Sequence, residues 1–122
     1  MDFKETQKLI HANAKAKGFY ESEIVNVGEK LMLIVSELSE VLEADRVGYH
    51  CSQSNFLNHV ASTHDFEVSF RASVKDTFED ELADAVIRIM DLAEYMNINL
   101  EWHIEQKMRF NALREYKHGK AY

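Results

Sequence analysis

The chain has no proline, only four glycines and a single cysteine. A β-rich fold needs turn residues at short intervals, so this scarcity argues against one and favours long helices. The single Cys51 excludes an intrachain disulfide and is typical of a reducing compartment. No apolar run approaches the roughly eighteen residues of a membrane span, and the first residues lack the apolar region of a signal peptide. We therefore expect a cytoplasmic protein without membrane association.

Charge and length limit the function further. The 122 residues carry a formal net charge of −7 and contain no lysine- or arginine-rich block, which argues against binding to duplex nucleic acid. The length predicts a single domain over 1–122, and a chain this short buries a modest core alone, which favours helix pairing between subunits. An acidic protein still binds an anionic ligand where a metal ion reverses the local charge.

Apolar residues recur at three- and four-residue intervals in four stretches, as in amphipathic helices. The pattern predicts helices over 2–17, 22–46, 73–96 and 99–116, with Asn99 capping the last. The connection 48–72 has weak periodicity, and connections of this length are often lids or poorly ordered. Within it, residues 55–61 can form a short helix.

Two acidic pairs lie on the second and third predicted helices. Glu37 and Glu40 share one face of the second, and Glu81 and Asp84 share one face of the third. Arg88 follows Asp84 by four residues and is expected to pair with it. Like charges at this spacing destabilise a surface helix by about 0.2–0.5 kcal/mol per pair, and by more at low dielectric. One such pair alone usually marks a solvated face, whereas two pairs in largely apolar helices favour a shared Mg²⁺ or Mn²⁺.

Basic residues concentrate at the C-terminal end. Lys107, Asn111 and Arg114 share one face of the fourth predicted helix, and Lys117 and Lys120 follow. Guanidinium and ammonium groups are natural partners of phosphate oxygens. Alternatively, some of them simply complement the negative end of the helix dipole.

Taken together, these motifs resemble the MazG-like superfamily of all-α nucleotide pyrophosphohydrolases. The resemblance rests on E-L-S-E (37–40), E-L-A-D (81–84), the later K-x-x-x-N-x-x-R, the ending K-H-G-K and the opening H-A-N-A-K-A-K-G-F-Y. It covers nearly the whole chain except 48–72, which is longer than the link between acidic pairs in compact members of the family.

The resemblance implies an up-down bundle of four main helices, completed by dimerisation and sometimes doubled to a tetramer. It implies Mg²⁺-dependent hydrolysis of a nucleoside triphosphate to monophosphate and pyrophosphate, including house-cleaning of non-standard nucleotides. The site residues that it implies fall into two groups. Metal and catalysis are assigned to Glu37, Glu40, Glu81 and Asp84, with Glu37 the least certain ligand and a candidate base. Substrate binding is assigned to Lys107, Asn111, Arg114, Lys117, Lys120, Asn13 and Lys17.

Two other functional classes fit parts of the pattern. A non-catalytic helical adaptor or assembly protein would turn both acidic stripes toward water. A carboxylate-bridged di-iron protein requires two E-x-x-H pairs, and the chain offers only Glu115 with His118. Cys51, His59 and His64 fit no standard zinc spacing. The preferred base and sugar depend on pocket shape, which the sequence does not specify.

Overall fold

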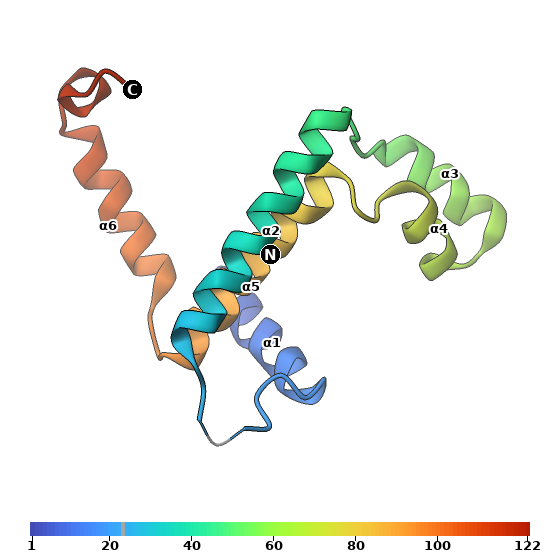
Figure 1. Ribbon diagram of the computed structural model, residues 1–122, viewed down its shortest axis with the longest axis horizontal. Coiled ribbons are helices and arrows are strands. Elements are labelled where there is room, and N and C mark those ends of the chain that lie inside the picture. The colour runs from blue at the N-terminus through green and yellow to red at the C-terminus, as the bar shows by residue number, and fades with distance from the viewer. Residues whose placement is uncertain (23) are drawn as a thin grey trace. The chain divides into compact units, whose positions relative to one another are not determined.

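The computed structural model describes residues 1–22 and 24–122. Within them it contains six α-helices, one short 3₁₀ helix and no strand, which confirms the predicted all-α fold (Figure 1). The elements are α1 (Phe3–Ala16), α2 (Val27–Val47), α3 (Gln53–Thr63), α4 (Phe66–Ser73), α5 (Phe78–Tyr95), α6 (Leu100–Ala112) and η1 (Tyr116–Gly119). Among the described helices, none has both the length and the hydrophobicity needed to cross a bilayer.

Side-chain caps lie at the starts of the four predicted helices. Asp2 accepts a hydrogen bond from the Glu5 amide (3.0 Å) at the start of α1. Asn99 accepts one from the Trp102 amide (3.2 Å), as predicted for α6. The second helix begins at Val27, later than the predicted residue 22, because Asn26 caps it through the Glu29 amide (3.1 Å). Residue 23 of the predicted range lies outside the described residues.

The third predicted helix also begins late, at Phe78 instead of residue 73. The hydroxyl of Thr77, which is fully buried, accepts from the Asp80 amide (3.3 Å), and Asp76 before it has a positive φ of 65°. A left-handed residue interrupts a helix, so the segment before it folds separately. It forms α4, which the sequence did not predict, while α3 confirms and extends the short helix expected over 55–61. The fourth helix ends at Ala112, four residues before the predicted end.

The described chain divides into two compact units. The first contains residues 1–22 with 90–122, and hydrogen bonds join α1 to the end of α5 in it. Gln7, which is buried, donates to Glu94 (2.9 Å) and to the carbonyl of Ile98 (3.0 Å). The carboxylate of Asp91 lies 2.8 Å from His11 Nδ1 and accepts from the Tyr20 hydroxyl at 2.6 Å. These bonds connect residues more than seventy positions apart.

Replacing Tyr20 with phenylalanine tests this connection. Burial, followed by the hydrogen bond to Asp91, raises the pKa of the Tyr20 phenol, so the group stays a protonated donor. The Tyr20→Phe variant loses a charge-assisted hydrogen bond, and we expect the free energy of unfolding to fall by about 1–2 kcal/mol in urea titrations. The matched control is Tyr122→Phe, because Tyr122 is fully exposed and its removal should change nothing. Equal stability of both variants would mean that water replaces the hydroxyl.

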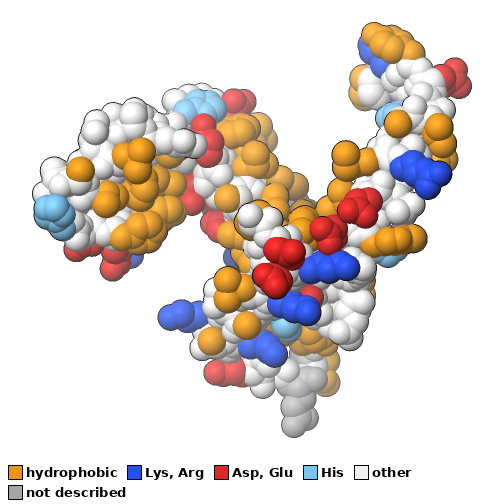
Figure 2. Space-filling model, turned by 180° about the vertical axis from the view of Figure 1, so that it is seen from behind, with side chains coloured by type: hydrophobic (Ala, Val, Ile, Leu, Met, Phe, Trp, Pro, Cys, Tyr) orange, Lys and Arg blue, Asp and Glu red, His pale blue; other side chains and the backbone are white. Residues whose placement is uncertain are grey.

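The second unit contains residues 24–89. Figure 1 shows α2 and the first turns of α5 side by side and antiparallel. Beyond them α3 and α4 form a hairpin in which the ring of Phe66 lies 6.0 Å from Phe56 and 5.7 Å from Phe70. Figure 2 shows exposed hydrophobic side chains gathered on one side of this hairpin. Leu57 of α3 and Phe66 of α4 are both exposed.

The core of the chain is small. Seven described hydrophobic residues are buried, and three of them are alanines. Four apolar residues of α2, spaced four, three and four positions apart, form a stripe whose side chains are 48–51% exposed. Three apolar residues of α5, spaced four and three positions apart, form a second stripe that is 40–48% exposed. The α2 stripe is Leu31, Val35, Leu38 and Leu42, and the α5 stripe is Leu82, Val86 and Ile89. These faces are as apolar as the sequence indicated, but a single chain does not cover them.

Candidate metal centre

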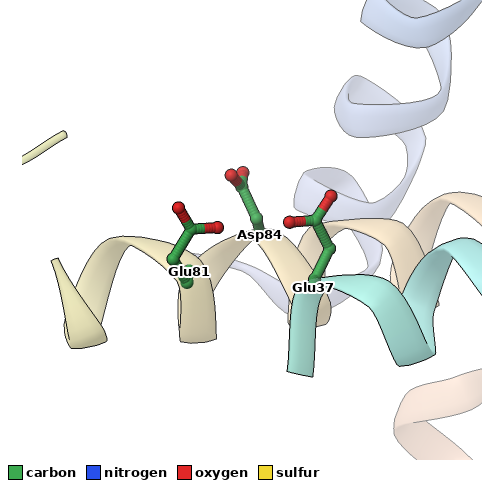
Figure 3. Close-up of side chains that lie close together, drawn as sticks. All are labelled: Glu37, Glu81 and Asp84. Atoms are coloured by element: carbon green, nitrogen blue, oxygen red, sulfur yellow. The ribbon is translucent and has the colours of Figure 1, made fainter. Parts of the chain in front are cut away.

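Three carboxylates from two helices meet in the second unit. Glu37 comes from α2, and Glu81 and Asp84 come from α5. A ligand oxygen from each lies within 4.8 Å of the other two, and Figure 3 shows the three side chains on the same side of the paired helices. Two oxygens around an octahedral Mg²⁺ lie roughly 3–4 Å apart at metal–oxygen distances of about 2.1 Å. The cluster is therefore close to the size of one coordination sphere.

Helical register places two of these acids on the faces where α2 and α5 meet. Glu37 lies three residues after Ile34 and four before Val41, and both of these are buried. Glu81 lies four residues before Ala85, which is 2% exposed. Residues spaced three and four apart share one helical face, so these acids occupy positions normally taken by apolar side chains.

Glu81 is the most buried acid of the cluster, with 5% of its surface exposed. The pKa of Glu81 is raised to about 7, and burial is the largest cause. The other causes of this shift are the charge of Glu40, a hydrogen bond with Glu37 and the charges of Glu37 and Asp84. A buried carboxyl surrounded by carboxylates keeps its proton unless a cation compensates the charge. A cation bound at this position would offset the negative charge of the cluster.

Asp84 responds to the same surroundings. Its pKa is raised, first by burial and then by the charges of Asp80 and Glu37, and it is partly lowered by Arg88. Arg88 does not form the predicted ion pair with Asp84. Its Nε donates to Oε1 of Glu37 at 2.6 Å, because Arg88 lies seven residues after Glu81 and shares the α5 face turned toward α2.

Glu40 has a different position from the other three predicted metal ligands. It is exposed and lies outside the three-carboxylate cluster, although its charge raises the pKa of Glu81. The structure thus brings three of the four acids together and leaves the fourth close enough to act electrostatically. The assignment of all four to metal and catalysis stays a prediction.

A second group of carboxylates shares Glu81 and was missed by the sequence reasoning. It consists of Asp76, Asp80 and Glu81. Asp80 accepts from the Asp76 amide at 2.9 Å, and both carboxylate oxygens of Asp76 lie within 3.0 Å of the Lys75 ammonium. The D-x-x-x-D-E spacing was the available signal. Asp76 is exposed and paired with Lys75, so this group is more open to solvent than the first.

The predicted substrate contacts all belong to the first unit. Lys107 and Arg114 of the α6 region both lie over the Phe110 ring, with their charged groups 5.2 and 5.6 Å from its centroid. Both charged groups therefore lie near the same aromatic ring. Lys117 Nζ lies 5.7 Å from the centroid of the Tyr116 ring. The remaining predicted contacts are Asn111 on α6, Lys120 after η1, Asn13 on α1 and Lys17, the C-cap of α1. Their roles in substrate binding stay predictions.

Comparison of the chain with protein-family models, curated proteins and solved structures found no match. The interpretation of function therefore depends on the sequence motifs and on the carboxylate cluster. The cluster offers carboxylate oxygens from two helices as ligands. The Glu81 carboxyl, with its pKa raised to about 7, is partly protonated near neutral pH. Oxygen donors of this kind suit hard divalent cations such as Mg²⁺ and Mn²⁺.

Proposed function

We propose that this chain is a Mg²⁺-dependent nucleoside triphosphate pyrophosphohydrolase that releases nucleoside monophosphate and pyrophosphate. Glu37, Glu81 and Asp84 hold the metal, with Mn²⁺ as a substitute, and Glu40 supplies further negative charge. The observation that supports this best is the burial of Glu81 among other carboxylates, with its pKa raised to about 7. The class of reaction comes from the motif resemblance.

In this reaction water adds to the α-phosphorus, and the bond to the α–β bridging oxygen breaks to release pyrophosphate. Glu37, Glu81 and Asp84 would hold a divalent ion, which would supply charge neutralisation at the phosphate oxygens. Glu81 must first release its proton to solvent before both of its oxygens can act as ligands. Lys107, Asn111 and Arg114 hold the phosphates, with Lys117 and Lys120 as further cationic contacts. Asn13 and Lys17 contact the sugar, base or phosphate.

The proposal includes a homodimer that completes a four-helix bundle. The half-exposed stripes of α2 and α5 are the surface that a second copy would cover. Two such dimers would form the tetramer.

A panel of ribo- and deoxyribonucleoside triphosphates tests the proposal directly. We expect Mg²⁺-dependent release of pyrophosphate from at least one nucleotide, abolished by chelator and lowered at least about 100-fold by Asp84→Asn. Asp45→Asn is the matched control, because Asp45 is an exposed α2 residue outside both carboxylate groups. Absence of release across the panel, together with no metal-dependent thermal shift, would favour the non-catalytic adaptor. The panel also identifies the preferred base and sugar.

A further inference from the structure

A cationic side chain of the same chain already contacts the candidate metal centre. Arg88 Nε lies 2.6 Å from Oε1 of Glu37, and the two side chains are 37% and 14% exposed. A guanidinium is charged at every physiological pH. The Glu37 carboxylate therefore already has a cationic partner, and a divalent ion that uses the same oxygen must compete with it.

We propose that Arg88 is the resident cation of the metal-free centre and leaves Glu37 when a divalent ion binds. This inference rests on the proposed function, since it requires that the cluster binds metal. Its consequence is that the charge of Arg88 limits the affinity for the ion. The guanidinium that is released is then available to the triphosphate oxygens, which it can bind through paired hydrogen bonds.

Position and charge both support this exchange over a purely structural ion pair. Arg88 shares the α5 face of Glu81 and Ala85, and it contacts the cluster through Glu37 while its side chain stays partly exposed. Arg88 also lies four residues after Asp84, one helical turn away on α5. A cation within this range of two ligands repels an incoming dication, and the repulsion persists as long as Arg88 stays on Glu37.

Mn²⁺ binding, followed by the electron paramagnetic resonance of the free ion, tests the proposal in three variants of the full chain. We expect Arg88→Gln to bind Mn²⁺ at least about fivefold more tightly than wild type, because one positive charge is removed. Arg88→Lys keeps the charge and should remain within about twofold of wild type. Arg46→Gln is the control, since Arg46 makes an exposed pair with Glu43 on α2.

Thermal unfolding separates exchange from a structural role. In chelator, Arg88→Gln should unfold at a lower temperature than wild type, and it should gain more from added Mn²⁺. An ion pair that only stabilises the fold would lower the unfolding temperature equally with and without Mn²⁺ and leave the Mn²⁺ affinity unchanged. That result would overturn the proposal.

A measurement on the wild-type protein avoids dependence on how the variants fold. The Arg88 Nε–H resonance, assigned by its absence in Arg88→Lys, should exchange slowly with water in chelator and faster at saturating Mg²⁺. Unchanged exchange would also overturn the proposal. Wild-type protein that binds no Mn²⁺ would overturn both this inference and the metal-dependent function. Equal Mn²⁺ affinity of wild type and Arg88→Gln would overturn the inference alone.

Discussion

Glu81→Gln should make the metal-free protein more stable by about 3 kcal/mol at pH 8, although it removes a predicted metal ligand. The carboxyl of Glu81 is 5% exposed, and its pKa rises from the ordinary 4.5 to about 7 in the folded chain. At pH 8 the folded protein must ionise this buried group beside Glu37 and Asp84. Glutamine has nearly the same shape, carries no charge and keeps a donor for Glu37, so the repulsion disappears.

The sign of the pH dependence follows from the same shift. Because the pKa of Glu81 is higher in the folded chain than in the unfolded chain, the folded state keeps a proton that the unfolded state releases above about pH 4.5. The resulting stabilisation is fully present below pH 4.5 and is lost as pH rises to about 7. In chelator, the difference in stability between Glu81→Gln and wild type should therefore grow from pH 5 to pH 8.

Urea titrations at several pH values, with and without Mg²⁺, measure this prediction. Mg²⁺ should stabilise wild type increasingly as pH rises through 7, because the ion competes with the proton on Glu81. Glu81→Gln should lose most of this response. Glu105→Gln serves as the control, because Glu105 is exposed and lies outside the carboxylate groups. A Glu81→Gln protein that is less stable than wild type in chelator at pH 8 would contradict the interpretation that ionised Glu81 destabilises the metal-free cluster.

The sequence predicted most of the helices, but it did not predict where α2 and α5 begin. Periodicity of apolar residues located α1, α2, α5 and α6, because an amphipathic face leaves a signal over several turns. The starts of α2 and α5 depend on single caps. Asn26 and Thr77 each accept one amide hydrogen bond, and apolar residues before them continued the pattern. The short α4 is eight residues long, too few for its periodicity to stand out.

The sequence predicted the part of the candidate site that lies within each single helix, which is the pairing of neighbouring acids on one face. A spacing of three residues places Glu37 beside Glu40 and Glu81 beside Asp84 on their helical faces, and no further information is needed. Which acid becomes buried depends on how α2 and α5 pair. That pairing buries Glu81 and leaves Glu40 exposed.

Hydrogen bonds between helices could not be predicted from the sequence, because they also depend on how the helices pair. Arg88 was expected to bind Asp84, its neighbour on one helix, but it binds Glu37 across the α2–α5 pair. Asp91 continues the acidic stripe of α5 by spacing, yet in the first unit its oxygens are used by His11 and Tyr20. One stripe of α5 therefore serves a candidate ligand site in one unit and a structural connection in the other.

Leu38→Glu should convert the proposed dimer to monomers. Leu38 is 48% exposed in the single chain and lies within the α2 stripe, between Val35 and Leu42. In a twofold interface the substitution removes two leucines, each contributing about 1.5–3 kcal/mol when fully buried, and introduces two carboxylates. We expect Kd to weaken by at least roughly 100-fold. Sedimentation velocity at micromolar concentration distinguishes a 14.2 kDa monomer from a dimer.

Met32→Glu is the matched control for this experiment. Met32 lies on the same helix and is more exposed (63%), but it is outside the half-exposed stripe. The control variant should sediment as wild type does. Wild-type protein that sediments as a monomer, or Leu38→Glu protein that keeps the wild-type mass, would contradict the proposed dimer.

Metal binding by the Leu38→Glu monomer separates assembly from the site. Glu37, Glu81 and Asp84 all come from one chain, so a variant that keeps its helical circular dichroism should still bind Mn²⁺. Loss of turnover with retained Mn²⁺ binding would show that the second copy is needed for substrate and not for the metal. Loss of Mn²⁺ binding at unchanged helix content would instead show that the second copy fixes the pairing of α2 with α5.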